Sequence, residues 1–238
     1  MSETHTYPGE ELELFQHAVN WKRYFSTTIR PYIGQSVLEA GAGIGSNTSL
    51  LFSDKTNHWL LLEPDETMFA VLEKKIADGI LPSACKCLKG TTELVQEQFD
   101  TILYIDVLEH IEKDREELER AAGLLVPGGH LVVLSPAFPV LYSPFDKVIG
   151  HYRRYTRKMI RSVTPAGLTL TRNRYYDSVG FFAGLVNRLF LKQRYPTQQQ
   201  VLFWDRWMVP VSRVTDLLCF YSFGKSIISV WKKPLQDL

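Results

Sequence analysis

Three glycines at alternate positions follow an apolar run and form the most informative chemical feature of this chain. The segment VLEAGAGIGSNT, residues 37–48, leads from a predicted buried strand into Gly41, Gly43 and Gly45, with Glu39 two residues before the first glycine. Glycines permit a tight turn, and their lack of a Cβ lets a ligand lie against the backbone. The G-x-G-x-G spacing differs from the usual dinucleotide motif and lacks the lysine of a phosphate loop. A carboxylate at Glu39 would repel a pyrophosphate but suits a cationic ligand.

A second acid, Glu63, ends the next predicted strand, and Pro64 and Asp65 follow it. An acid at a strand end about twenty residues after a glycine loop accepts hydrogen bonds from ribose hydroxyls. The alternative is a solvent-exposed acid near the start of a helix. Together, the loop and Glu63 indicate a site for a nucleoside without a pyrophosphate.

Two histidines follow predicted strands and are candidate catalytic bases for an acceptor that must lose a proton. His110 comes shortly after the apolar run FDTILYI, and His151 lies in the stretch DKVIGHYRRYT, residues 146–156. His110 has an equal alternative, in which it only tethers its loop. His130 falls inside a predicted strand and is interpreted as structural.

The same basic and aromatic stretch is predicted to bind the acceptor. Arg153 and Arg154 can pair bidentately with a carboxylate or phosphate, while Tyr152 and Tyr155 can contact an apolar body. The competing interpretation is a solvated basic loop in which one arginine pairs with Asp146.

Short apolar runs alternate with helical patterns, which predicts a parallel sheet with helices on both faces and ligands beyond the carboxyl ends of the strands. The predicted strands are residues 36–40, 58–63, 84–89, 99–105, 129–135, 168–176 and 225–231. The predicted helices between the first five strands are residues 46–53, 65–78 and 112–125. Ser46 and Thr156 are expected to cap the helices that follow them.

The chain is expected to form one domain over residues 1–238, with two additions to the sheet. Residues 1–33 form an N-terminal helical segment, because Leu14, Ala18, Trp21 and Phe25 recur at helical spacing. Residues 178–223 form an aromatic-rich helical insertion before the last strand. This insertion is either a unit with its own small core or a lid over the site that contacts a membrane surface.

Four blocks in order, E-x-G-x-G-x-G, LLLEPD, FDTILYIDVLEHI and LVPGGHLVVLSPA, resemble class I S-adenosylmethionine-dependent methyltransferases. The resemblance is closest to the group that includes the ubiquinone and menaquinone methyltransferases. It implies a Rossmann-like sheet of seven strands in the order 3-2-1-4-5-7-6, with the last strand antiparallel. It also implies S-adenosylmethionine as cofactor and S-adenosylhomocysteine as product.

The resemblance assigns cofactor contacts residue by residue. Glu39, Ala40 and the loop from Gly41 to Gly45 would hold the methionine moiety, and Glu63 with Pro64 the ribose. Thr91 and Thr92 would lie beside the adenine, although many relatives have an aspartate there. Asp106 and Val107 would flank the sulfonium.

Composition limits the remaining classes of function. A formal net charge of +1 argues against a broad nucleic-acid footprint, and the N-P-P-Y type motif of base methyltransferases is replaced by Asp106-Val107-Leu108-Glu109. The three cysteines and six histidines show no paired ligand spacing, so no metal is predicted and Cys85 and Cys87 are expected to be inert. No secretory signal or membrane span is recognisable, which predicts a cytoplasmic protein.

The sequence therefore predicts a methyltransferase that modifies a small or lipid-like, anionic acceptor in biosynthesis, with O- or C-methylation favoured and N-methylation open. One alternative is an NAD-dependent oxidoreductase, which the loop spacing and Glu39 disfavour. Another is a partner subunit that binds the cofactor without catalysis.

Overall fold

A seven-stranded sheet organises the molecule, which the computed structural model describes over residues 14–191 and 193–235. Its strands are β1 (Ser36–Ala40), β2 (His58–Glu63), β3 (Cys85–Lys89), β4 (Phe99–Ile105), β5 (Leu125–Pro136), β6 (Thr169–Tyr176) and β7 (Ser226–Lys232). The order is β3-β2-β1-β4-β5-β7-β6. The pairs among β1 to β5 are parallel, and β7 runs antiparallel to both neighbours. The predicted fold is confirmed.

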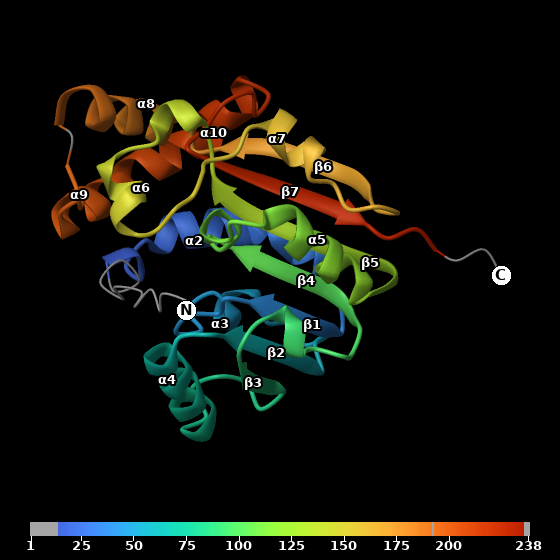
Figure 1. Cartoon of the computed structure of the whole chain (residues 1–238). Coiled ribbons are helices and arrows are strands. Elements are labelled where there is room, and N and C mark those ends of the chain that lie inside the picture. Colours follow the sequence, from blue (N-terminus) through green and yellow to red (C-terminus); the bar gives the residue numbers. More distant parts are fainter. Residues whose placement is uncertain (1–13, 192, 236–238) are drawn as a thin grey trace, which may run out of the picture.

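Alternate side chains of the strands enter two separate hydrophobic cores, one on each face of the sheet. Val37 and Leu103 belong to the first core, which α2 (Val19–Ile29), α3 (Thr48–Leu51), α4 (Glu66–Ala77) and α10 (Val209–Leu218) cover. Leu38 and Ile102 belong to the second, which α5 (Asp114–Gly123) and α7 (Arg157–Ser162) cover. Figure 1 shows α5 and α2 on opposite sides of the strands. Burial on both faces explains the continuous apolar runs of the parallel strands.

Some predicted boundaries differ from the structure. β5 begins at Leu125 rather than at residue 129, and α3 is a single turn that starts at Thr48. The prediction that Ser46 caps α3 is wrong. The N-cap position of α3 is Asn47, and no side chain makes a capping hydrogen bond there. Thr156 does cap α7, since its hydroxyl accepts from the Met159 N–H.

The helical region before β7 packs onto the body of the protein. It contains α8 (Ser178–Val186), the π-helical turn η5 (Asn187–Leu191), α9 (Gln198–Phe203), the π-helical turn η6 (Trp204–Met208) and α10. Val201, Trp204 and Val209 join the first core beside Trp21 of α2. Part of this region is therefore packed in the core of the sheet rather than in a core of its own, and its prediction as a separate insertion stays a prediction.

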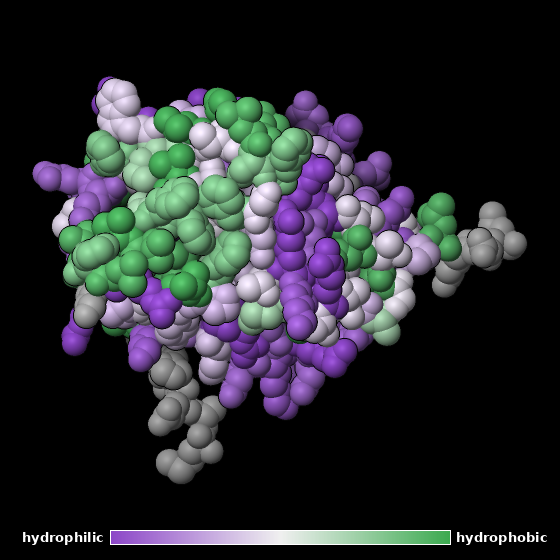
Figure 2. All heavy atoms as spheres, turned by 90° about the horizontal axis from the view of Figure 1, so that it is seen from above, coloured by the Kyte–Doolittle hydropathy of each residue, from purple (hydrophilic) through white to green (hydrophobic). Residues whose placement is uncertain are grey.

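The outer side of these helices is apolar. Figure 2 looks onto this side and shows a broad hydrophobic area. The apolar patch consists of exposed side chains, namely Phe182, Val186, Leu189, Phe190, Leu191, Leu202, Phe203, Trp207, Val211, Val214, Leu217, Leu218 and Phe220. Within the described part of the chain, none of the helices combines the length and the apolar character needed to cross a membrane.

The apolar residues predicted to lie on one helical face near the N-terminus contact the first core. Ala18, Trp21 and Phe25 are buried in the first core and Leu14 packs against it. The helix that carries them, α2, begins only at Val19, and residues 1–13 lie outside the described part. Cys85 and Cys87 are free thiols in the structure.

Candidate functional site

A large cavity lies beyond the carboxyl ends of the parallel strands and reaches the helical region before β7. Its volume is about 1890 Å³. Its walls come from the glycine loop, the ends of β2, β4 and β5, the segment from Leu141 to Arg154, and the helices α2, α8 and α9. Single-ligand pockets occupy roughly 300–1,000 Å³, so this cavity has room for two ligands side by side.

The glycine loop forms one wall of the cavity through Gly41 and Gly43. The φ angles of Gly41, Gly43 and Gly45 are 64°, 57° and 73°, in the left-handed region that favours glycine. A Cβ on Gly41 would lie 2.6 Å from the side chain of Val107, so the loop packs directly on the segment after β4. The Lys75 ammonium donates to the Ile44 carbonyl at 2.6 Å and holds the far side of the loop.

Glu63 is buried at the end of β2 and binds the glycine loop. One of its carboxylate oxygens accepts from the Gly43 N–H at 2.7 Å, and the other accepts from the Asp65 N–H at 2.9 Å. Burial raises the pKa of Glu63, and the two N–H bonds oppose this effect. Each carboxylate oxygen can accept a second hydrogen bond, so Glu63 can still bind ribose hydroxyls from the cavity side.

Glu39 is buried behind the loop rather than in the cavity wall. Its carboxylate accepts from the Thr48 hydroxyl at 2.8 Å and from the Trp59 indole N–H at 3.0 Å. These bonds tie β1 to α3 and β2. Burial raises the pKa of Glu39 to about 7, against the lowering effect of both bonds. Its predicted contact with the methionine moiety stays a prediction.

We expect Glu39→Gln to change the pH dependence of stability. A folded-state pKa of about 7 exceeds the ordinary 4.5, so protonated Glu39 contributes stability that is fully present below pH 4.5 and lost as pH rises through about 7. Glutamine does not titrate, and the variant should gain about 2 kcal/mol over the wild type as pH rises from about 5 to about 8. Urea unfolding at several pH values checks this, and a constant difference would contradict it.

Asp106 directly follows β4, lines the cavity and has a strained backbone. Its φ is 54°, unusual for a residue other than glycine and often a mark of functional sites. The Asp106 side chain is open to the cavity, and the protein around it raises its pKa, while the charges of Lys225, Arg154 and Lys22 lower it. Val107 lines the cavity beside it. A carboxyl group in this position lies close enough to a bound ligand to exchange a proton with it.

Other predicted cofactor residues lie outside the cavity wall. Ala40 is buried in the second core, and Gly45 packs against Leu72 and Leu81. Thr91 is exposed, and the Thr92 hydroxyl donates to Glu117 of α5 at 2.8 Å. Pro64 does line the cavity. The adenine contact therefore remains a prediction without support from the cavity lining.

The stretch of residues 146–156 is organised around a buried carboxylate, Asp146. Arg154 donates to both oxygens of Asp146 at 2.7 and 3.1 Å, and His151 Nδ1 lies 2.8 Å from one of them. The Ser143 N–H and hydroxyl donate to the same carboxylate. Burial alone would raise the pKa of Asp146, but the bonds from His151 and Arg154 outweigh it and hold this pKa well below its usual range.

The neighbouring residues of the stretch make their own internal contacts. Arg153 pairs with Asp114 at 2.6 Å, and the Tyr155 hydroxyl donates to the same carboxylate at 2.8 Å. Tyr155 is fully buried in the second core. Of the four predicted acceptor residues, Tyr152 and Arg154 line the cavity, whereas Arg153 and Tyr155 do not.

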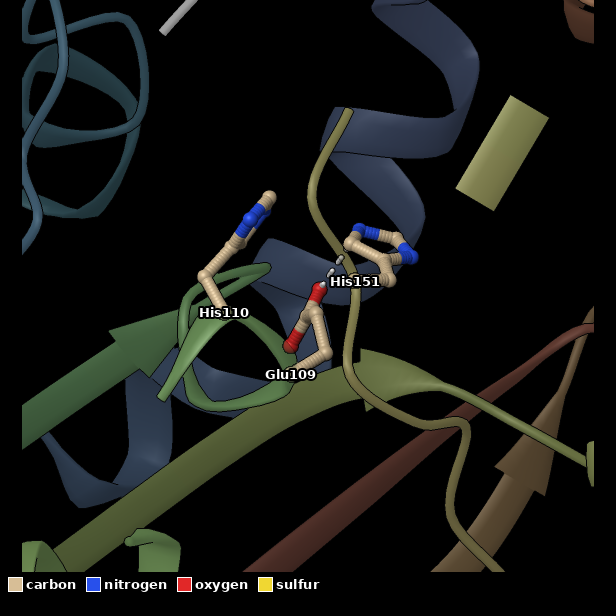
Figure 3. Close-up of side chains that lie close together, drawn as sticks. All are labelled: Glu109, His110 and His151. Carbon is tan, nitrogen blue, oxygen red and sulfur yellow. Dashed lines mark ion pairs between the residues drawn. The ribbon is translucent and has the colours of Figure 1, made fainter. Parts of the chain in front are cut away.

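The hydrogen bond to Asp146 places the His151 ring beside His110, which lies in the segment after β4. The two rings are 4.6 Å apart in an edge-to-face arrangement, and His151 Nε2 lies 3.8 Å from Glu109. Figure 3 shows these three side chains together. Burial, with the repulsion from His151 when that ring is protonated, lowers the pKa of His110 to about 3. Burial also lowers the pKa of His151, against the raising effect of Asp146. Both histidines are neutral near pH 7, and the low pKa makes His110 a weak base.

Among the polar side chains of the cavity that sequence reasoning missed are Lys22, Glu109 and Lys225. Burial is the main cause that lowers the pKa of both lysines. The Lys225 ammonium also lies 4.4 Å from the ring centroid of Trp204. Glu109 could have been noticed from its position beside His110. No local pattern marks either lysine, because each comes from an element distant from the glycine loop.

Comparison with known proteins agrees with this geometry. Residues 38–131 match a family model described as a methyltransferase domain. No curated protein matches the chain significantly.

Solved structures share its fold over nearly the whole chain. A S-adenosylmethionine-dependent methyltransferase from Clostridium acetobutylicum has a TM-score of 0.60 at 11% identity, covering 95% of this chain and 98% of its own. Coclaurine N-methyltransferase, bound to N-methylheliamine and SAH, has a TM-score of 0.60 at 12% identity, covering 90% and 72%. An O-methyltransferase family protein from Burkholderia thailandensis has a TM-score of 0.58 at 13% identity, covering 94% and 59%.

Proposed function

We propose that the chain is a class I S-adenosylmethionine-dependent methyltransferase, which its fold and its match to a methyltransferase domain support, and that it methylates a lipid-like acceptor. The observation that carries this proposal is the cavity of about 1890 Å³, which joins the glycine loop to the apolar patch. Val186, Leu191 and Phe203 belong to both the cavity wall and the patch. An apolar chain could therefore pass from the surface of the protein to the cofactor.

The residues of the loop fit S-adenosylmethionine, which supplies an electrophilic methyl group on a sulfonium. Gly41 and Gly43 present bare backbone to the cavity, and Glu63 presents carboxylate oxygens beside them. Asp106 adds a second acid at the end of β4. Acidic groups favour a cation, and the enclosing wall limits access of water to the reacting atoms.

The acceptor in this proposal carries a polar, anionic headgroup. Arg153 and Arg154 are paired with Asp114 and Asp146, so they support this charge less than the sequence suggested. Lys22 and Lys225 support it instead, because both line the cavity. The helical segment 178–223 acts as a lid whose outer face rests on a membrane surface. The single domain over residues 1–238 and the cytoplasmic location stay predictions.

Two measurements test the proposed function. Calorimetry with S-adenosylmethionine and with NAD should show binding of the first alone; binding of NAD alone would favour the oxidoreductase. Release of S-adenosylhomocysteine should then be measured with amphiphiles that share one alkyl chain and carry a hydroxyl, carboxylate, phosphate or amine. Cofactor binding without release from any of them would favour the non-catalytic subunit.

Phe190 of the apolar patch offers a specific mutation. Its side chain is 76% exposed, so Phe190→Ser should change the free energy of unfolding by no more than about 0.5 kcal/mol. Loss of its apolar contact should raise the KM for an amphiphile in vesicles by about tenfold. Ile80→Ser is the matched control, because Ile80 is 63% exposed outside the cavity and the patch. Equal effects of both variants would contradict a role for the patch.

A further inference from the structure

Three side chains of the cavity wall form a donor set suited to a divalent transition metal. Glu109, His110 and His151 each offer one ligand atom, and these atoms lie within 4.8 Å of one another. Two imidazoles and one carboxylate form the protein ligands of several catalytic metal sites, including zinc sites and non-haem iron sites. Metal–donor bonds of about 2.1 Å place tetrahedral donors roughly 3.4 Å apart, so the three side chains would move closer together on binding an ion.

The orientation of His151 is the one that metal-binding histidines have. Its Nδ1 is hydrogen-bonded to Asp146 at 2.8 Å, which leaves Nε2 on the side of Glu109 at 3.8 Å. Histidine ligands almost always give their second ring nitrogen to a carboxylate or carbonyl, which sets the tautomer and the ring orientation. Arg154 and Ser143 hold Asp146 in turn. His110 is similarly hydrogen-bonded to the Gly150 backbone.

The position of the three donors leaves room for a further ligand. All three residues line the cavity, and Asp106 lies on the same segment after β4. Catalytic zinc sites likewise combine three protein ligands with one open position for water or substrate. Figure 3 shows the Glu109 carboxylate directed at His151, with His110 beside it.

We propose that Glu109, His110 and His151 bind a divalent transition-metal ion whose open coordination position takes a hydroxyl oxygen of the acceptor. The site would make the acceptor an alcohol or phenol rather than an amine. This inference about the acceptor rests on the proposed methyltransferase function. The proposal that the three residues bind a metal ion does not depend on that function.

The chemistry of the step follows from the charge of the ion. A hydroxyl bound to a divalent cation loses its proton more readily, and here that proton passes to solvent water. A lone pair of the oxygen then forms the new bond to the methyl carbon. The bond between that carbon and sulfur breaks, and its electron pair stays on sulfur. The products are a methyl ether, S-adenosylhomocysteine and one proton.

The first test measures metal binding alone. The full chain, freed of metal by dialysis against EDTA, is titrated with Co²⁺ and followed by calorimetry and visible absorption. A single Co²⁺ should bind per chain, and Glu109→Gln and His151→Ala should each weaken binding by about 100-fold. His130→Ala is the control, because His130 packs against Tyr32 outside the cavity. Circular dichroism confirms that each variant is folded. Absence of saturable binding, or equal binding by folded variants, would overturn the site.

The second test separates the metal from the methyltransferase activity. Binding of S-adenosylmethionine is measured on the same metal-free samples and should be retained. Release of S-adenosylhomocysteine with the hydroxyl amphiphile should fall at least about tenfold without metal and recover with Co²⁺ or Zn²⁺. Equal release without metal overturns the catalytic role, and preference for the amine overturns the acceptor class. Metal binding without cofactor binding would instead reject the proposed function and leave the site standing.

Discussion

Replacement of Gly43 by valine is expected to abolish binding of S-adenosylmethionine. Gly43 lines the cavity and its N–H donates to Glu63 at 2.7 Å. A valine side chain adds atoms to the wall where the ligand must approach the backbone. Its backbone must also hold a φ of 57°, which costs of order 1–3 kcal/mol for a residue with a Cβ. Calorimetry should detect no binding where the wild type saturates.

A control is needed because this backbone cost also lowers stability. Gly79 lies just after α4 with a φ of 69°, and nothing lies within 4 Å of an added Cβ. Gly79→Val therefore has the same type of backbone strain without adding atoms to the cavity. Both variants should lose similar free energy of unfolding, while only Gly43→Val loses the ligand. If Gly43→Val bound S-adenosylmethionine as tightly as the wild type does, the glycine loop would not be part of the cofactor site.

Removal of the Asp146 carboxylate should be the most destabilising change in the segment after β5. Asp146→Ala leaves Arg154 charged, 7% exposed and without its bidentate partner. Loss of one member of a buried ion pair costs about 3–5 kcal/mol, because the remaining charge is desolvated and uncompensated. Urea unfolding at neutral pH measures this loss.

Two further variants identify the cause of the loss. Glu116→Ala breaks an exposed pair with Lys113 and should cost no more than about 1 kcal/mol. Asp146→Ala combined with Arg154→Met removes both charges and should recover part of the loss. Because the folded-state pKa of Asp146 lies below its ordinary value, its contribution is present above that value and lost as pH falls. If Asp146→Ala lost no more free energy of unfolding than Glu116→Ala does, this role of Asp146 would be contradicted.

Local patterns were sufficient for the sheet and for the outline of the cofactor site. Parallel strands buried on both faces must be continuously apolar, so runs such as HWLLLE mark β2 without further information. Glu63 ends β2, and Gly43 lies in the loop after the neighbouring parallel strand β1, so a sheet of this order brings the two residues together. The resemblance of four blocks to methyltransferases supplied the strand order itself.

Local sequence patterns could not show which groups the polar side chains would pair with in the folded protein. The types of residue in DKVIGHYRRYT allowed both acceptor binding and internal pairing, and the fold uses Arg154 and Arg153 for pairing with Asp146 and Asp114. That choice depends on α6 (Pro144–Val148) placing Asp146 in a buried position.

The cluster of Glu109, His110 and His151 and the lysines of the cavity arise in the same way, from segments far apart in the chain. Helical and strand periodicities reflect interactions between residues a few positions apart, and they were readable in the order of amino acids. Contacts between loops that are far apart in the chain form only when the helices and strands between them pack together. No local pattern in the sequence reports that packing. The cavity, its size and its charged lining are therefore properties of the folded protein alone.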